Sequence, residues 1–252
     1  MLKPSGKEEQ MNGPIRVSWT PAPSASDSIP FEGSRLTRAQ RWLSLAEFIA
    51  GSAIVIGHNV YHVIPNEVPI LFVIGLISLR LRDGGWRVMG LRWPVSWRQT
   101  ILIALGVAAA RLLLGAVVID PLTARFWPAA VAPSGVEEIT GNVAVALRWL
   151  LIVWTFAAFG EEISYRGYLL TRAADVGARS KTNYWVAVLM VSVLFGIGHY
   201  YKGPSGMVDS GMAGLVLGTA YLLSGRSLWV CILAHGFIDT FGVIALFFGW
   251  QT

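Results

Sequence analysis

The sequence contains one cysteine, Cys231, among 252 residues. A single thiol excludes an intrachain disulfide and any metal cluster built on several cysteines. Charge is also scarce, since only 14% of the residues are charged while 54% are hydrophobic, and the mean hydropathy is +0.55. This composition excludes an ordinary soluble domain. It predicts an all-α fold, a polytopic bundle of transmembrane helices.

The first 38 residues have no apolar run and are rich in Pro, Ser, Gly and charged residues, which is typical of a disordered tail. They also lack the apolar core of a signal peptide, so we expect the first span itself to direct insertion. The predicted organisation is a disordered cytoplasmic tail at 1–38 and an integral membrane domain at 39–252.

Seven apolar runs follow the tail, and a perpendicular span needs about 20 residues. Three of the runs are short, so the sequence predicts about seven spans, with a range of roughly six to eight. The runs are Trp42–Val63, Val68–Leu81, Thr100–Leu122, Trp149–Leu170, Tyr184–His199, Met207–Leu223 and Leu228–Phe248.

The basic residues indicate the orientation of these spans. Cytoplasmic loops of membrane proteins are enriched in Lys and Arg. If the N-terminus is cytoplasmic and the spans alternate, fifteen basic residues lie inside, three outside and two within spans. We therefore expect an integral protein of the cell (plasma) membrane with a cytoplasmic N-terminus. The three outside are Arg125, Arg148 and Lys202, the two within spans are Arg111 and Arg166, and the rest are Lys3, Lys7, Arg16, Arg35, Arg38, Arg41, Arg80, Arg82, Arg87, Arg92, Arg98, Arg172, Arg179, Lys181 and Arg226.

Three short polar motifs lie inside or at the edge of apolar runs. An ionisable group at membrane depth costs about 3 kcal/mol on insertion scales, and such groups usually have a function. Together the motifs supply carboxylates, imidazoles and a counter-charge, which are the ingredients of acid–base chemistry. They are Glu161-Glu162-Ile-Ser-Tyr165-Arg166, Phe195-Gly-Ile-Gly-His199 and His235-Gly-Phe-Ile-Asp239.

The first motif separates two adjacent carboxylates. On an α-helix Glu162 and Arg166 are i,i+4 neighbours and form an ion pair, while Glu161 is rotated by about 100° and lacks that partner. An unpaired carboxyl in apolar surroundings suits a general base or acid. The alternative is an interfacial ion pair with a spare Glu. If the span begins near Trp149, Glu161 lies near mid-depth, about 18 Å along the helix.

The other two motifs repeat the i,i+4 spacing. Phe195 can pack beneath the imidazole of His199, and Asp239 can orient His235 and stabilise its charged form. Each histidine alone is as often a satisfied interior residue. Their convergence on one bundle with Glu161 favours a shared site.

Other polar or small residues carry weaker signals. His58 and His62 have a spacing that can bind a metal, but no third ligand is near. Arg111 is expected to reach the interface or to pair with an acid inside the bundle. Small residues at four-residue intervals indicate close helix packing in the sixth run, at Ser210, Gly214 and Gly218.

The ordered set of motifs resembles the CPBP family of intramembrane proteases, which includes the CAAX prenyl endopeptidases and the bacterial Abi and bacteriocin-immunity relatives. The resemblance covers the protease-like core at about 149–248. It implies that Glu161 and His199 activate a water, and that His235 and Asp239 stabilise the oxyanion of an attacked peptide carbonyl. Glu162, Arg166 and Phe195 are then supporting residues. An ionised Asp239 has no proton to donate, so it must be protonated or orient His235.

The resemblance implies hydrolysis without a metal or other cofactor. From the residues alone, zinc held by Glu161, His199 and His235 is an alternative, because these side chains can bind zinc and leave a position for water. The expected partners are the lipid bilayer and a membrane-associated peptide or protein substrate, with no nucleic acid. A second reading is a non-enzymatic membrane protein of the same fold, such as an immunity factor, a transporter-like module or a scaffold.

Overall fold

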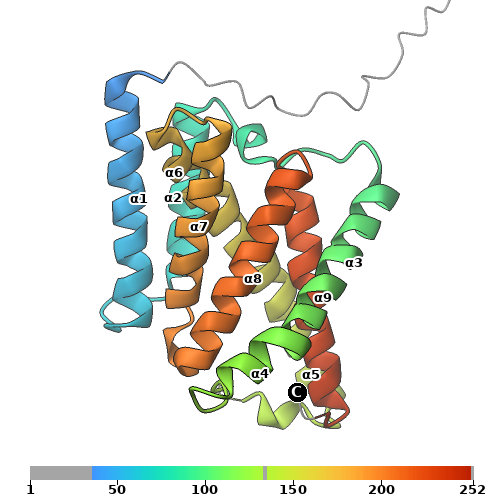
Figure 1. Ribbon diagram of the computed structural model, residues 1–252. Helices are drawn as coiled ribbons and strands as arrows, with labels where there is room; N and C mark the ends of the chain where they lie inside the picture. The colour runs from blue at the N-terminus through green and yellow to red at the C-terminus, as the bar shows by residue number, and fades with distance from the viewer. Residues whose placement is uncertain (1–35, 133–134, 251–252) are drawn as a thin grey trace, which may run out of the picture.

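The computed structural model describes residues 36–132 and 135–250, and within these ranges it is helical with no strand. Figure 1 shows the helices standing side by side as a bundle, which confirms the predicted all-α architecture. The elements are α1 (Arg38–Asn59), α2 (Glu67–Arg82), η1 (Trp86–Met89), α3 (Trp97–Leu114), η2 (Gly115–Ile119), α4 (Asp120–Thr123), η3 (Glu137–Ile139), α5 (Val143–Ile152), η4 (Val153–Leu169), α6 (Leu170–Val176), α7 (Lys181–Ile197), η5 (Tyr200–Lys202), α8 (Gly203–Leu223) and α9 (Leu228–Phe247).

Several elements join into continuous rods, so the described residues form seven helical passes along the bundle. Four of the described helical units are long and apolar enough to span a membrane: Trp97–Thr123, Val143–Val176, Tyr200–Leu223 and Leu228–Phe247. The apolar helix Lys181–Ile197 is shorter. The structure thus confirms a polytopic bundle, and α1 and α2 are the passes in which length or apolarity is weakest.

The first helix begins where a capping box satisfies its free backbone amides. Thr37 accepts from the amide of Gln40, and the Gln40 side chain accepts from the amide of Thr37. This reciprocal pair is a strong start signal. Arg38 is therefore the first helical residue, while 1–35 of the predicted tail lie outside the described residues.

The fourth pass is longer than the sequence suggested. It begins at Val143, capped by Asn142, rather than near Trp149, and it continues to Val176 over 34 residues. Glu161 nevertheless lies near the middle, because the helix continues well beyond it. The helix thus extends before Trp149, and its 34 residues exceed the roughly 20 that a perpendicular span needs.

Close packing of α7 against α8 confirms the structural role of the small residues. A Cβ added at Gly214 would lie 3.1 Å from the Cα of Ser192, and one at Gly218 would lie 2.9 Å from Val188. Larger side chains would force the helices apart, so these positions set their separation. This contact fixes α7, the helix that leads to His199.

A buried network of charges joins α1, α2 and α6 at one end of the bundle. Arg172 is fully buried and contacts carboxylates of Glu47 (2.9 Å), Asp83 (2.8 Å) and Asp175 (2.9 Å). Arg179 pairs with two of the same acids. Buried charges are tolerated when they are paired and hydrogen-bonded. The network therefore stabilises the end of the bundle without leaving an isolated charge.

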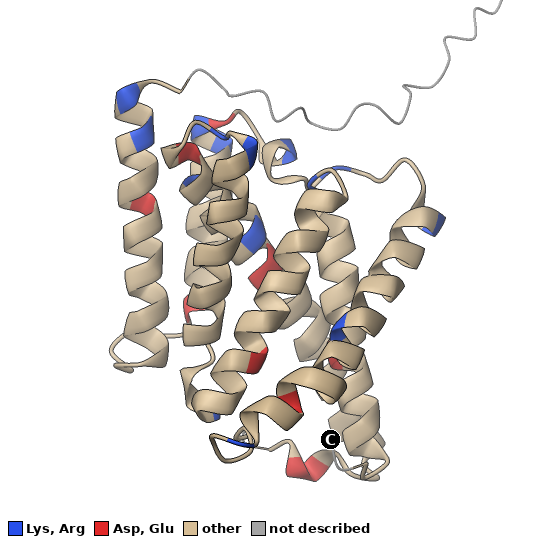
Figure 2. Cartoon of the chain, viewed as in Figure 1, with Lys and Arg blue, Asp and Glu red and all other residues tan. Residues whose placement is uncertain are grey.

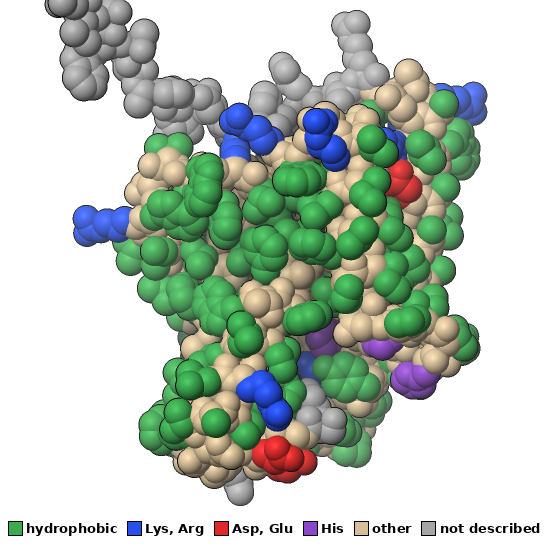
Figure 3. All heavy atoms as spheres, turned by 180° about the vertical axis from the view of Figure 1, so that it is seen from behind, with side chains coloured by type: hydrophobic (Ala, Val, Ile, Leu, Met, Phe, Trp, Pro, Cys, Tyr) green, Lys and Arg blue, Asp and Glu red, His purple; other side chains and the backbone are tan. Residues whose placement is uncertain are grey.

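Basic residues gather at that same end. In Figure 2 most of the Lys and Arg positions, coloured blue on the backbone, lie in the upper part of the bundle, where α1 begins. Figure 3 shows the molecule from behind, where hydrophobic side chains, coloured green, cover most of the middle of the surface. An apolar band agrees with an integral membrane protein, and the enrichment of Lys and Arg in cytoplasmic loops predicts that the basic end is the cytoplasmic one.

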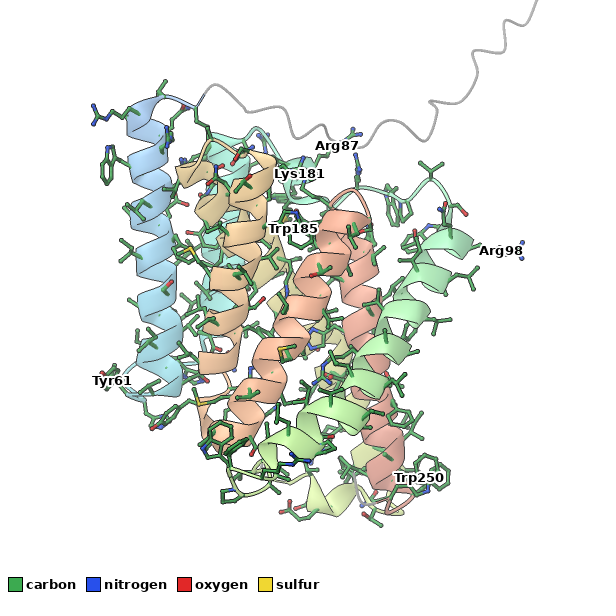
Figure 4. The ribbon with its side chains drawn as sticks, viewed as in Figure 1. Tyr61, Arg87, Arg98, Lys181, Trp185 and Trp250 are labelled. Atoms are coloured by element: carbon green, nitrogen blue, oxygen red, sulfur yellow. The ribbon has the colours of Figure 1, made fainter. Side chains whose placement is uncertain are left out.

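We expect cysteines at the two ends to react differently with a membrane-impermeant thiol reagent. Figure 4 places Arg87, Arg98 and Lys181 at one end and Tyr61 and Trp250 at the other. In intact cells, Tyr61→Cys is expected to be labelled and Lys181→Cys to be protected. Native Cys231 is buried, so the background is low. Labelling of Lys181→Cys but not Tyr61→Cys would reverse the orientation.

Candidate active site

A π-helix carries the first motif. Glu161 and Glu162 lie in η4, which has π-helical hydrogen bonding where an α-helix was expected. This π-helical segment is 17 residues long, whereas π-helical segments in proteins are usually single turns. The expected pairing survives this change, since Arg166 Nη1 donates to Glu162 Oε1 at 2.8 Å and both side chains are almost completely buried. The guanidinium also lies over the ring of Phe195, 4.4 Å from its centroid.

Glu162 has a second partner that the sequence did not reveal. His235 Nδ1 lies 2.7 Å from Glu162 Oε1, so this carboxylate joins the first motif to the third. Asp239, the residue expected to orient His235, lies 3.6 Å from the other ring nitrogen, Nε2, which is too long for a hydrogen bond. Glu162 therefore orients His235. Residues 73 apart in sequence give no spacing signal for such a contact.

Glu161 keeps a free carboxylate oxygen. Its Oε2 is buried without a hydrogen-bond partner and lies 4.0 Å from His235 Nε2. The side chain as a whole is 17% exposed. An unpartnered buried oxygen is costly unless something else, such as a substrate or a water, binds it. Oε2 of Glu162 is also buried without a hydrogen-bond partner, but Glu162 is held through Oε1 by Arg166 and His235. Of the two adjacent carboxylates, Glu161 is thus the one that no arginine or hydrogen-bonded imidazole holds in place.

The imidazole of His199 is fixed at one nitrogen. Its Nδ1 lies 2.8 Å from the backbone oxygen of Phe195, and a carbonyl can only accept, so Nδ1 carries the proton. In the neutral ring Nε2 is then an acceptor. The predicted ring contact with Phe195 is present, at 4.7 Å between centroids. Among the described residues, no direct hydrogen bond or ion pair joins His199 to Glu161.

Phe195 separates the two histidines. Its ring centroid is 4.7 Å from that of His199 and 6.2 Å from that of His235. The edge of Tyr165 packs against the same ring at 4.9 Å and 90°. Phe195 is therefore the apolar centre around which the charged and imidazole groups are arranged.

The helix α9 is held close to the first motif by a glycine. A Cβ at Gly236 would lie 2.5 Å from the indole of Trp154. The same indole donates its Nε1–H to Thr240 Oγ1 at 3.2 Å. Only glycine allows this approach, and it places His235 within reach of Glu162. The pair of Trp154 and Gly236 was not identified from the sequence.

The remaining polar candidates lie outside this constellation. His62 lies beyond the end of α1 with a left-handed backbone, so His58 and His62 do not share a helix face. His58 instead contacts Glu67. Arg111 pairs with Asp209 of α8, which confirms the second of the two expectations for it.

The donor set does not fit a metal. No group of three or more His, Cys, Asp or Glu side chains in the described parts of the chain could hold a metal ion. The zinc alternative through Glu161, His199 and His235 therefore lacks converging ligands in this arrangement. Activity measured after chelation tests the zinc alternative experimentally.

Comparison with known proteins agrees with the resemblance of the motifs. Residues 143–241 match the family described as type II CAAX prenyl endopeptidase Rce1-like. The matched segment is less than half of the chain but contains all three motifs. No curated protein and no solved structure matches the chain. Over residues 143–241, this chain is therefore similar to the Rce1-like type II CAAX prenyl endopeptidases, in agreement with the resemblance of its motifs to the CPBP family.

Proposed function

We propose that this protein is an intramembrane endopeptidase that hydrolyses a peptide bond of a membrane-associated substrate with a water activated by Glu161. The observation that carries the proposal is the buried, unpartnered Oε2 of Glu161, 4.0 Å from His235 Nε2. A buried carboxylate oxygen without a partner beside an oriented imidazole suits proton transfer during acyl chemistry better than it suits a scaffold.

Glu161 and His199 are proposed to share the attacking water. Glu161 takes one proton while Nε2 of His199 accepts a hydrogen bond from the other hydrogen. The water oxygen bonds to the carbonyl carbon, and the C=O electron pair moves onto the carbonyl oxygen. Collapse of this intermediate breaks the C–N bond, and the proton on Glu161 passes to the leaving amine. The products are a carboxyl and an amine, and Glu161 is regenerated.

His235 and Asp239 are proposed to stabilise the oxyanion. Because Glu162 accepts from Nδ1, the Nε2–H of a protonated His235 is directed to the opposite side, toward Glu161 and Asp239. A preorganised donor of this kind stabilises charge that develops in the transition state. Asp239, 3.6 Å from Nε2, favours the charged imidazole when ionised and donates a hydrogen bond when protonated. This mechanism needs no metal or other cofactor.

Identification of cleavage products tests the activity. Membranes from cells expressing the wild type, Glu161→Gln or the matched control Glu137→Gln can be compared for new peptide termini. Glu137 is an exposed carboxylate outside the site. We expect termini that are present with the wild type and Glu137→Gln and absent with Glu161→Gln. Identical termini in all three samples would favour the non-enzymatic reading.

A further inference from the structure

A second buried polar cluster lies between the α1–α2 connection and the first motif. Glu67, at the start of α2, is 6% exposed and accepts a hydrogen bond from Asn59 Nδ2 at 3.0 Å. His58 Nε2 lies 3.3 Å from its other carboxylate oxygen. Asn59 is held in turn by the carbonyl of Val55 at 3.1 Å. Glu67 is therefore fixed by two residues of α1.

The same carboxylate interacts electrostatically with the hydroxyl of Tyr165. Tyr165 lies in the first motif and is 1% exposed. Its ring is locked edge-on against Phe195, at 4.9 Å and 90°. With the ring packed against Phe195 and the hydroxyl interacting with the fixed carboxylate of Glu67, Tyr165 has little freedom to move.

The Tyr165 hydroxyl also touches the segment that carries His199. A Cβ built on Gly198 would lie only 2.8 Å from Tyr165 Oη, so the hydroxyl rests directly on the backbone before His199. This backbone is the C-terminal end of α7, and His199 is held there by the Phe195 carbonyl. Tyr165 thus supports both Phe195 and Gly198, the two residues that set the imidazole's place.

We propose that Tyr165, anchored by Glu67, is a positioning residue that holds the Gly198–His199 backbone so that His199 reaches the attacking water. The inference rests on the proposed hydrolytic function. A misplacement of about 1 Å can reduce the rate of a preorganised reaction by roughly a hundredfold. The effect therefore falls on turnover and leaves substrate binding unchanged.

Tyr165→Phe tests the role of the hydroxyl while keeping the ring. We expect kcat to fall by roughly tenfold to a hundredfold with KM unchanged, using a substrate identified by the terminus comparison. Tyr221→Phe is the matched control, because Tyr221 is a fully buried tyrosine of α8 whose hydroxyl donates to the Met89 carbonyl at 3.0 Å. It also loses a buried hydrogen bond, but kcat should stay at the wild-type value.

Substitutions at Glu67 and Gly198 provide two further tests. Glu67→Gln keeps an acceptor for the Tyr165 hydroxyl and should retain much more activity than Glu67→Ala. Gly198→Ala should reduce kcat because its methyl group meets the hydroxyl, and Gly198→Ala/Tyr165→Phe should recover part of that loss. This recovery is a coupling that independent structural damage would not produce.

Three results would overturn the inference. One is a wild-type kcat for Tyr165→Phe. Another is a fall in activity that follows thermal stability equally in Tyr165→Phe and Tyr221→Phe. The third is the loss of the proposed function itself, seen when Glu161→Gln cleaves the substrate as fast as the wild type. A Glu161→Gln variant that cleaves at the wild-type rate refutes both the proposed hydrolysis and the positioning role of Tyr165. An inactive Glu161→Gln variant together with a fully active Tyr165→Phe variant refutes only the positioning role.

Discussion

Glu161→Gln is expected to lower the cleavage rate by about two to four orders of magnitude, the usual contribution of a general base. Glutamine keeps the shape of the side chain but has no carboxylate to accept the proton of water. The fold should persist, because Oε2 of Glu161 has no hydrogen-bond partner whose loss would destabilise it. The measurement is the cleavage rate of the identified substrate in membrane vesicles, normalised to the amount of folded protein.

Glu161→Asp provides the companion variant. It retains the carboxylate but shortens its reach, so we expect partial activity, between the wild type and Glu161→Gln. Equal loss in both variants would mean that the position matters through packing instead of proton transfer.

Arg166→Ala is expected to lower the free energy of unfolding by about 3–5 kcal/mol, the usual cost of removing one partner from a buried ion pair. Glu162 is completely buried and would lose Arg166 as an ion-pair partner, which leaves His235. Activity should fall as well, because the same carboxylate orients His235. Thermal unfolding and expression level measure the first effect, and the cleavage rate measures the second.

Arg148→Ala is the control for loss of an arginine. Arg148 is 60% exposed and lies 4.0 Å from Glu138, itself 62% exposed, so its removal should change stability very little. A well-expressed Arg166→Ala protein with the thermal stability of Arg148→Ala would contradict a buried Glu162–Arg166 pair.

The all-α fold and the pairing within each motif could be predicted because they depend on local periodicity. Apolar runs showed the helices, and i,i+4 spacing gave the pair of Glu162 with Arg166 and the contact of Phe195 with His199. The positions of Gly214 and Gly218 likewise predicted a close helix contact. Each of these signals needs only the geometry of one helix.

Contacts between helices could not be predicted in this way. The bond from His235 to Glu162 depends on how α9 packs on η4, which is set by Gly236 against Trp154. Without it, the neighbour on the same helix, Asp239, was the only visible candidate to orient His235. The role of Glu67 could not be predicted because it stands one residue before an apolar run. An acidic residue is common in the first turn of a helix, so its position gave no sign of a special contact.

The ion pairs at the basic end of the bundle could not be predicted either. Arg172 and Arg179 were placed on the cytoplasmic side, and the structure shows both largely buried and paired with Asp83 and Asp175, with Glu47 as a further partner of Arg172. Their partners are spread over three segments, so no single window of sequence reveals the network. Their presence at the basic end still agrees with the orientation inferred from charge.

The most direct test of the central claim is the single-turnover cleavage rate of purified protein in liposomes, measured with and without a metal chelator and compared with Glu161→Gln. The account predicts that chelation leaves the wild-type rate unchanged, while Glu161→Gln lowers it by about two to four orders of magnitude. Loss of activity on chelation with recovery on adding zinc, or an undiminished rate in Glu161→Gln, would contradict hydrolysis by a glutamate-activated water.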